Sequence, residues 1–308
     1  MVSSPKSQAE PLSSEPTSTP TAPVSPAPSQ PHSIRLVALD LDGTLVDHAL
    51  RMSVGVREAI ARAQQQGTII TLATGRMFSA TVSFARQLDI HAPLICYQGG
   101  WIQAPEGEVL HRTPLGEDEA HLAIELGRSH GWHTVLYAEG QLYLDSLRHP
   151  MSYYERLLGP DPTVEPRLEA VLQDRTADKV LFVAEPAQIE AMERVLQAHF
   201  GQTAEIIQSH AEFIEVVPPG ITKGAALAWL AAYLDIPREA VMAVGDQRND
   251  LSMITWAGVG VAMGNAVPEV RAAADWIAPT LAEDGAAKAL ERYVLGTSPV
   301  TPGPGRAP

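Results

Sequence analysis

Two stretches of this sequence alternate short, continuously apolar segments with amphipathic segments. In the first stretch, residues 34–40, 68–74 and 93–97 read as strands, and residues 53–67 and 78–88 read as helices. The second stretch has helices at 222–234, 250–257, 268–274 and 283–295, with strands at 240–246, 258–263 and 275–278. Strands without a polar face, joined by helices, are typical of a parallel sheet that is covered on both sides. We therefore predict an α/β fold with a Rossmann-like parallel-sheet core.

Between these stretches, from about Gly99 to Ala211, strands and helices follow a different order. The parallel-sheet pattern stops and then resumes, so we predict an α+β domain inserted into the core rather than following it. The predicted core domain comprises residues 33–98 and 212–295, and the inserted domain comprises residues 99–211.

The two ends of the chain differ from the rest in composition. Residues 1–32 contain eight prolines and eight serines, and residues 296–308 are similar in character. Such segments cannot bury enough apolar surface to offset chain entropy, so we predict that both are disordered. Because we find neither a secretory signal nor an apolar run of about 20 residues, we expect a cytoplasmic protein without a membrane span.

The formal net charge of -14 argues against a nucleic-acid-binding protein, which would present a basic face. A small phosphorylated substrate remains compatible with this charge, because a metal ion can supply positive charge locally. The single cysteine, Cys96, excludes an internal disulfide and a cysteine-rich zinc site.

Polar segments fall where the predicted strands end or a helix begins: Asp40–Thr44, Ala73–Arg76, Thr222–Lys223 and Gly245–Asp250. In an open α/β sheet, ligands bind at the carboxyl ends of the strands. Clustered carboxylates repel one another unless a cation sits among them, and oxygen ligands without Cys or His favour Mg²⁺. One carboxylate could attack phosphorus, and a second could protonate the leaving oxygen and then activate water.

The segments "DLDGT", "ATGR", "GITKG" and "GDQRND", in this order, resemble the four signatures of the haloacid dehalogenase (HAD) superfamily of phosphohydrolases. The resemblance extends from Ser33 to Leu295. The large insert between the second and third motifs, together with "GVGVAMGNA", is similar to the Cof-like subgroup, in which the insert is an α/β cap.

The resemblance implies a role for each matching residue. Asp40 would be the nucleophile, and Asp42 the general acid and base. The phosphate-binding residues would be Leu41, Gly43, Thr74, Lys223 and Asn249. The metal ligands would be Asp40, Asp42 through its backbone carbonyl, Asp246 and Asp250. The substrate mouth would be bordered by Gly75, Arg76, Gln98 and Asn265.

Two of these positions carry open questions. The subgroup commonly has an Asn-Gly pair where this chain has Gln98-Gly99, and the extra methylene of Gln98 alters any contact made there. Arg76 contacts substrate, pairs with a nearby acid or caps the end of a strand.

These features predict a Mg²⁺-dependent phosphatase that acts through an aspartyl-phosphate on a small phosphorylated metabolite: a sugar phosphate, a nucleotide or a phosphorylated cofactor. Two alternatives stay open, namely a phosphomutase or phosphotransferase on the same scaffold and a catalytically silent ligand-binding module. We expect a monomer or homodimer with no nucleic-acid or membrane partner.

Overall fold

The computed structural model describes Met1 and residues 33–296. The predictions of disorder for residues 1–32 and 296–308 lie outside the described residues, apart from Met1 and Gly296.

A five-stranded, all-parallel sheet forms the core, as the sequence predicts. In the order β14-β13-β12-β1-β2, its strands are Trp276–Ile277, Val259–Ala262, Val241–Gly245, Leu36–Leu39 and Ile69–Leu72. Every residue of the two central strands, β12 and β1, is buried, which explains their unbroken apolar sequence.

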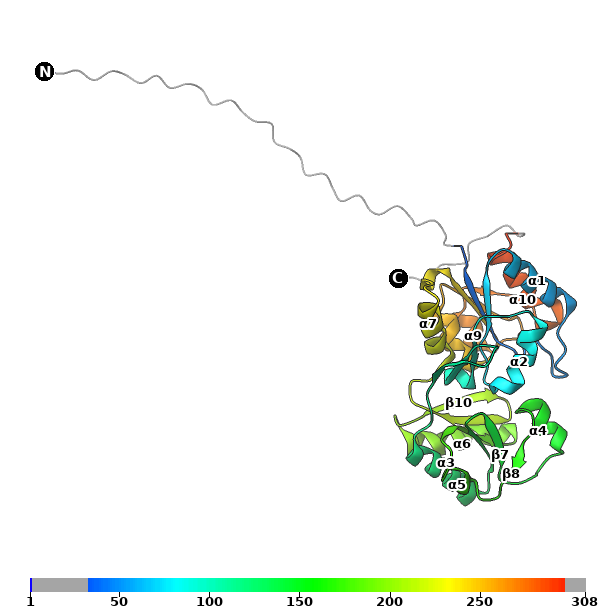
Figure 1. Ribbon diagram of the computed structural model, residues 1–308, viewed down its shortest axis with the longest axis vertical. Helices are drawn as coiled ribbons and strands as arrows, with labels where there is room; N and C mark the ends of the chain where they lie inside the picture. Colours follow the sequence, from blue (N-terminus) through cyan, green and yellow to red (C-terminus); the bar gives the residue numbers. More distant parts are fainter. Residues whose placement is uncertain (2–32, 297–308) are drawn as a thin grey trace. The chain divides into compact units, whose positions relative to one another are not determined.

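Helices cover this sheet, with α7 on one side and α1 and α10 together on the other (Figure 1). The helices of this part are α1 (Val54–Gln65), α2 (Phe78–Gln87), α7 (Lys223–Tyr233), α8 (Leu251–Trp256), α9 (Pro268–Ala273) and α10 (Gly285–Tyr293), with 3₁₀ turns at Arg238–Ala240, Arg248–Asp250 and Leu281–Glu283. The hydroxyl of Ser53 accepts a hydrogen bond from the Val56 amide and begins α1. The hydroxyl of Thr222 does the same for Ala225, so that Lys223 becomes the first residue of α7.

The predicted third strand departs from expectation. Strand β3 (Leu94–Cys96) forms no ladder with β2, and the pairing beside β2 is an isolated parallel bridge between Ala73 and Ile95. Strand β3 pairs instead with β4 (Trp101–Gln103) in a three-stranded sheet completed by β5 (Val109–Arg112). Pro93 has no amide hydrogen for a longer ladder, and its carbonyl accepts a bond from the Thr71 hydroxyl. The prediction that residues 93–97 form a full strand of the parallel sheet was therefore wrong in its pairing.

The region between β5 and α7 builds a six-stranded sheet, antiparallel except for the β7–β8 pair. In the order β10-β11-β9-β6-β7-β8, its strands are Glu205–His210, Phe213–Val217, Ala177–Val183, His133–Ala138, Gln141–Leu144 and Thr163–Val164. Its helices are α3 (Glu117–His130), α4 (Met151–Leu157), α5 (Leu168–Val171) and α6 (Pro186–Phe200).

The two faces of this sheet are used differently. In β6, Leu136 and Ala138 pack in a cluster with residues of α3 and α6, whereas Val135 and Tyr137 belong to the cluster of the parallel-sheet core. Because side chains alternate along a strand, one sheet can carry its own helices and also contact the core.

The division into a core domain of residues 33–98 and 212–295 and an inserted domain of residues 99–211 stays a prediction. Strand membership favours a later second boundary, since β11 belongs to the six-stranded sheet up to Val217.

Within the described part of the chain, no helix is both long enough and apolar enough to cross a bilayer.

Gly224 in α7 offers a test of how tightly the core helices pack. A Cβ there would lie 2.5 Å from the carbonyl oxygen of Ser252, a residue in the first turn of α8. Helix propensity alone would make Gly224→Ala stabilising by about 1 kcal/mol, but a clash with backbone cannot relax cheaply. We expect the substitution to lower the free energy of unfolding by about 1–3 kcal/mol in urea titrations.

The control for this substitution is Ala228→Gly, in the middle of the same helix, which should lose only about 1 kcal/mol through propensity. A Gly224→Ala protein as stable as the parent would contradict the tight contact between α7 and α8.

Candidate active site

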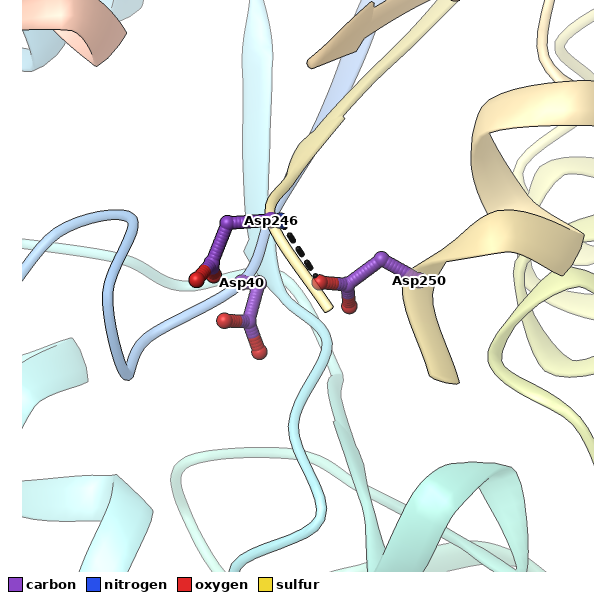
Figure 2. A group of neighbouring side chains, drawn as sticks. All are labelled: Asp40, Asp246 and Asp250. Carbon is purple, nitrogen blue, oxygen red and sulfur yellow. Dashed lines mark hydrogen bonds between the residues drawn. The ribbon is translucent and has the colours of Figure 1, made fainter. Parts of the chain in front are cut away.

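Neighbouring strands of the parallel sheet bring two aspartates together at their carboxyl ends. Strands β1 and β12 pair in register, with Leu39 opposite Val244. Asp40 follows the first of these strands directly and Asp246 follows the second, so both side chains emerge at the same edge (Figure 2). Asp250 reaches the same place from the 3₁₀ turn that ends the next loop.

The carboxylates of Asp40, Asp246 and Asp250 form a buried cluster. One oxygen from each lies within 4.8 Å of the others. Burial, reinforced by the charge of Asp250, raises the pKa of Asp40 well above its ordinary value. The same two causes raise the pKa of Asp246 to about 7. The protein therefore holds close together three groups whose ionised forms repel one another.

Lys223 supplies positive charge to this cluster. Its Nζ donates to Asp40 Oδ1 at 2.6 Å and to Asp250 Oδ1 at 2.5 Å, and its side chain is buried. Burial alone would lower the pKa of Lys223, but the charges of Asp250 and Asp40 outweigh burial and raise it. Lys223 is thus a fixed cation that offsets part of the repulsion.

Backbone amides set the direction of Asp250. Its Oδ2 accepts hydrogen bonds from the amides of Asp246 and Gln247 at 2.8 and 2.9 Å, and the first of these is the dashed line in Figure 2. The other oxygen, Oδ1, is left for Lys223. The loop that follows β12 therefore orients its own carboxylate.

The loop after β1 is built tightly around Asp246. Thr44 donates its hydroxyl to Asp246 Oδ1 at 3.1 Å, and Gln247 donates to Oδ2 at 2.9 Å. Gly43 has a φ of +83°, and a Cβ at this position would collide with the Asp246 carboxylate. Only glycine fits where the backbone turns this close to the acid.

Asn265, one of the predicted mouth residues, fastens the same loop. Its Nδ2 donates to the Gly43 carbonyl at 2.9 Å, and its Oδ1 accepts from the amide of Leu281.

Two of the predicted phosphate-binding residues, Leu41 and Gly43, have groups that are already buried or hydrogen-bonded within the protein. The side chain of Leu41 is fully buried, and the amide of Gly43 donates to the carbonyl of Val46.

Asp42 lies outside the carboxylate cluster and forms an ion pair with Arg76. The guanidinium donates from Nε to Asp42 Oδ2 at 2.7 Å and from Nη2 to Oδ1 at 2.8 Å. A third nitrogen, Nη1, donates to the carbonyl of Arg156 at the end of α4. Of the alternatives for Arg76, pairing with an acid is the one seen here. Arg76 also connects the six-stranded-sheet region to the core.

Gln98 does not border the substrate mouth. It is fully buried, with Nε2 bound to Glu215 Oε1 and Oε1 bound to the Nδ2 of Asn249, both at 3.0 Å. The expectation that Gln98 lines the mouth was wrong, because both polar atoms of its amide are bound to Glu215 and Asn249 and its side chain does not line the cavity beside the cluster. Gly75 lies directly against this side chain, since a Cβ on Gly75 would collide with Gln98 Nε2.

A cavity of about 790 Å³ opens beside the cluster. On the core side it is lined by Asp40, Asp42, Gly43, Thr74, Gly75, Arg76, Asp246, Asn249 and Asn265, among others. On the other side it is lined by Tyr137, Leu157, Leu158, Lys179, Leu181, Gln208, Ser209, His210, Phe213 and Glu215. Most of the predicted site residues therefore face one space, opposite a wall that the motifs did not predict. Part of that wall comes from odd-numbered positions of β6, β9 and β11, a pattern that becomes meaningful only once the strand pairing is known.

The chain is similar to several known proteins. The family model for haloacid dehalogenase-like hydrolases matches residues 37–290. The 5-amino-6-(5-phospho-D-ribitylamino)uracil phosphatase YcsE of Bacillus subtilis is 31% identical, over 85% of this chain and 96% of its own length. The HMP-PP phosphatase of Cronobacter sakazakii is 32% identical, over 77% and 87%. A haloacid dehalogenase-like hydrolase structure from Bacteroides thetaiotaomicron aligns with a TM-score of 0.74 and 32% identity, over 84% of this chain and 99% of that one.

Lys223 should be indispensable to stability when no divalent cation is present. Lys223→Met would leave the buried carboxylates without their cation, so we expect the free energy of unfolding in chelator to fall by about 3–5 kcal/mol. Mg²⁺ should restore part of this loss, because a bound cation would replace the missing charge. Urea titrations followed by circular dichroism, with and without Mg²⁺, measure both effects.

The matched control is Lys288→Met, which removes a surface pair with Glu291 and should cost about 0–1 kcal/mol. If the two variants were equally stable in chelator, Lys223 would not be the counter-charge of the cluster.

Proposed function

Because the chain belongs to the haloacid dehalogenase-like hydrolase family, we propose that it is a magnesium-dependent phosphatase of small phosphorylated metabolites. The observation that carries the proposal is the buried cluster of Asp40, Asp246 and Asp250, with Lys223 beside it and a cavity in front of it. Clustered acids next to a fixed cation suit a substrate whose negative charge arrives together with a metal ion.

The donor set fits Mg²⁺. Asp40, Asp246 and Asp250 would hold the ion, together with the backbone carbonyl of Asp42. These ligands are all oxygens, without the histidine or cysteine that softer metals favour. When bound, the ion would offset charge on the phosphoryl oxygens.

The chain's own residues would carry out the chemistry in two steps. In the first, a carboxylate oxygen of Asp40 bonds to phosphorus, the ester bond breaks, and Asp42 gives its proton to the leaving alcohol oxygen. In the second, Asp42 takes a proton from water, whose oxygen bonds to phosphorus and releases phosphate from Asp40. Throughout, Lys223, Thr74 and Asn249 would hold the phosphoryl oxygens.

Asp42 must change partners during this cycle. Both of its oxygens accept bonds from Arg76 in the structure, and that ion pair has to open before the carboxyl can carry a proton to the leaving group. Since Arg76 also holds the carbonyl of Arg156, substrate entry and the release of Asp42 would be linked.

The cavity wall opposite the carboxylate cluster suits a leaving group that has both apolar and polar parts. Tyr137, Leu181 and Phe213 offer apolar surface, while Gln208 and His210 offer polar atoms. The Bacillus subtilis relative YcsE is a phosphatase of a phosphorylated ribitylaminouracil, by its name. We propose a sugar phosphate, nucleotide or phosphorylated cofactor, hydrolysed in the cytoplasm by a monomer or homodimer.

Replacing the proposed nucleophile tests the reaction. Asp40→Asn keeps the shape of the side chain but cannot attack phosphorus, so turnover of p-nitrophenyl phosphate with Mg²⁺ should fall by roughly 10⁴-fold or more. Circular dichroism should show an intact fold, because the amide oxygen can still accept from Lys223. The exposed Asp89→Asn serves as the control, and comparable turnover by both variants would exclude Asp40 as nucleophile.

The wall should decide which substrate is preferred. Gln208 lines the cavity from β10, and Gln208→Leu replaces its amide with an apolar group. We expect kcat/KM for hydroxyl-rich sugar phosphates to fall by about 10-fold relative to p-nitrophenyl phosphate, as for the loss of one hydrogen bond.

Thr74→Val, in the core, should instead lower kcat/KM for all esters together, since every substrate shares the phosphoryl group. Equal losses on all substrates for Gln208→Leu would show that the wall does not select the leaving group.

A further inference from the structure

A buried ion pair lies on the face of the six-stranded sheet that points to the core. Lys179 of β9 and Glu215 of β11 are 2% and 1% exposed, and Lys179 Nζ donates to Glu215 Oε2 at 2.5 Å. The same Nζ donates to the carbonyl of Gly75 at 2.9 Å and lies 4.6 Å from the centre of the Tyr137 ring. No step of the proposed reaction uses this pair, although both residues line the cavity.

The pair continues into a chain of hydrogen bonds. Gln98 Nε2 donates to Glu215 Oε1 at 3.0 Å, and Asn249 Nδ2 donates to Gln98 Oε1 at 3.0 Å. The chain thus runs from the six-stranded sheet, through the turn after β3, to the loop after β12.

The direction of each bond follows from the first. A carboxylate in an ion pair has no hydrogen to donate, so Gln98 must turn its NH₂ group toward Glu215. The oxygen of the Gln98 amide then faces Asn249, so Asn249 must donate a hydrogen bond from its own NH₂ group. The charge of Glu215 therefore determines which way the amide of Asn249 is turned.

From this geometry we propose that Lys179, Glu215 and Gln98 form an amide relay whose role is to position Asn249 in the active site. The relay rests on the proposed function in one respect, namely that Asn249 meets the phosphoryl group. One N–H of the Asn249 amide donates to Gln98. Because the NH₂ group is planar, this bond also fixes the direction of the second N–H. The three relay members are positioning residues, because they act through Asn249.

The backbone is shaped to accommodate the relay. Gln98 has a φ of 61°, a conformation that costs a residue with a Cβ about 1 kcal/mol or more. Gly75 has no side chain where the Gln98 amide lies. The extra methylene of glutamine, relative to asparagine, lets one amide bridge β11 and the loop after β12.

Glu215→Gln changes the charge but hardly the shape of the side chain, and the relay predicts the direction in which each amide should turn. Lys179 must still face an oxygen, so the new amide on β11 would turn its NH₂ group toward Gln98. Gln98 would then turn its NH₂ group toward Asn249, and Asn249 would have to present its oxygen. Reversing one charge-determined bond should therefore invert every amide in the relay, with almost no change in volume.

A second variant should reverse that inversion. When Lys179→Met is combined with Glu215→Gln, no cation constrains the new amide, which can again offer its oxygen to Gln98 and its NH₂ group to the side that the lysine occupied. The double variant lacks both charges, so it avoids a buried unpaired ion. Removing the unpaired lysine would restore stability even for a purely structural ion pair, so the outcome that distinguishes the relay is the return of the Asn249 amide to its original orientation.

Two readouts separate the relay from the proposed function. Steady-state kinetics on p-nitrophenyl phosphate report on catalysis. The side-chain amide resonances of Asn249, assigned by their loss in Asn249→Asp, report on its orientation without substrate. We expect Glu215→Gln to shift these resonances and to lower kcat about 10–100-fold, the usual scale for a supporting contact, with KM nearly unchanged. The double variant should return both toward the wild-type values.

Two controls complete the experiment. Gln98→Met cuts the relay while leaving the ion pair in place, and it should lower kcat even if Glu215→Gln fails to fold. Asp178→Asn removes a buried carboxylate next to Lys179 on β9 that pairs with Arg112, so it should lower Tm but keep kcat within about threefold.

The relay would be overturned if the Asn249 resonances stayed in place in Glu215→Gln, if the double variant showed no recovery, or if Gln98→Met kept wild-type kcat. A wild-type protein that hydrolyses no phosphate ester would instead refute the proposed function. In that case the resonances alone would decide whether the relay exists.

Discussion

The interaction of Lys223 with Asp40 and Asp250 is the one on which the site depends. Three carboxylates are buried within 4.8 Å of one another, an arrangement that burial and repulsion both oppose. Among the described residues, Lys223 is the cation that bonds two of them at once. Its place follows from the start of α7, which the Thr222 hydroxyl sets. A helix cap thus holds the charge that permits an acidic site.

The six-stranded sheet contributes a wall and a support through the same alternation of side chains. On its outer face, residues such as Leu136 pack with α3 and α6. On its inner face, Tyr137, Leu181 and Phe213 line the cavity, and the Lys179–Glu215 pair reaches the loops of the core. The lining of the cavity and the contacts with the loops of the core therefore come from one set of positions.

The departure at Gln98 links these two parts. Where the related subgroup commonly has a shorter amide, this chain has one that spans from Asn249 to Glu215. The contact expected at the mouth is replaced by a contact beneath it. Gln98 forms hydrogen bonds with Glu215 of the six-stranded sheet and with Asn249 of the core. A substitution at this position would therefore remove contacts in both regions.

The sequence alone determined much of the fold and the inventory of the site. Unbroken apolar strands predicted the parallel sheet, amphipathic segments at 53–67 and 222–234 predicted α1 and α7, and four short motifs named the acids, Thr74, Lys223 and Asn249 as candidate site residues. The predictions of the sheet and of these two helices are confirmed, because they depend on residues close together in the chain. The rule that parallel strands end at one edge explains why Asp40 and Asp246 lie together. Only the tertiary structure decided the pairing of Asp42 with Arg76, the burial of Gln98, the partners of β3 and the wall of the cavity. Each of these depends on pairings and facing sides that a local pattern does not contain, and most join residues tens of positions apart or more.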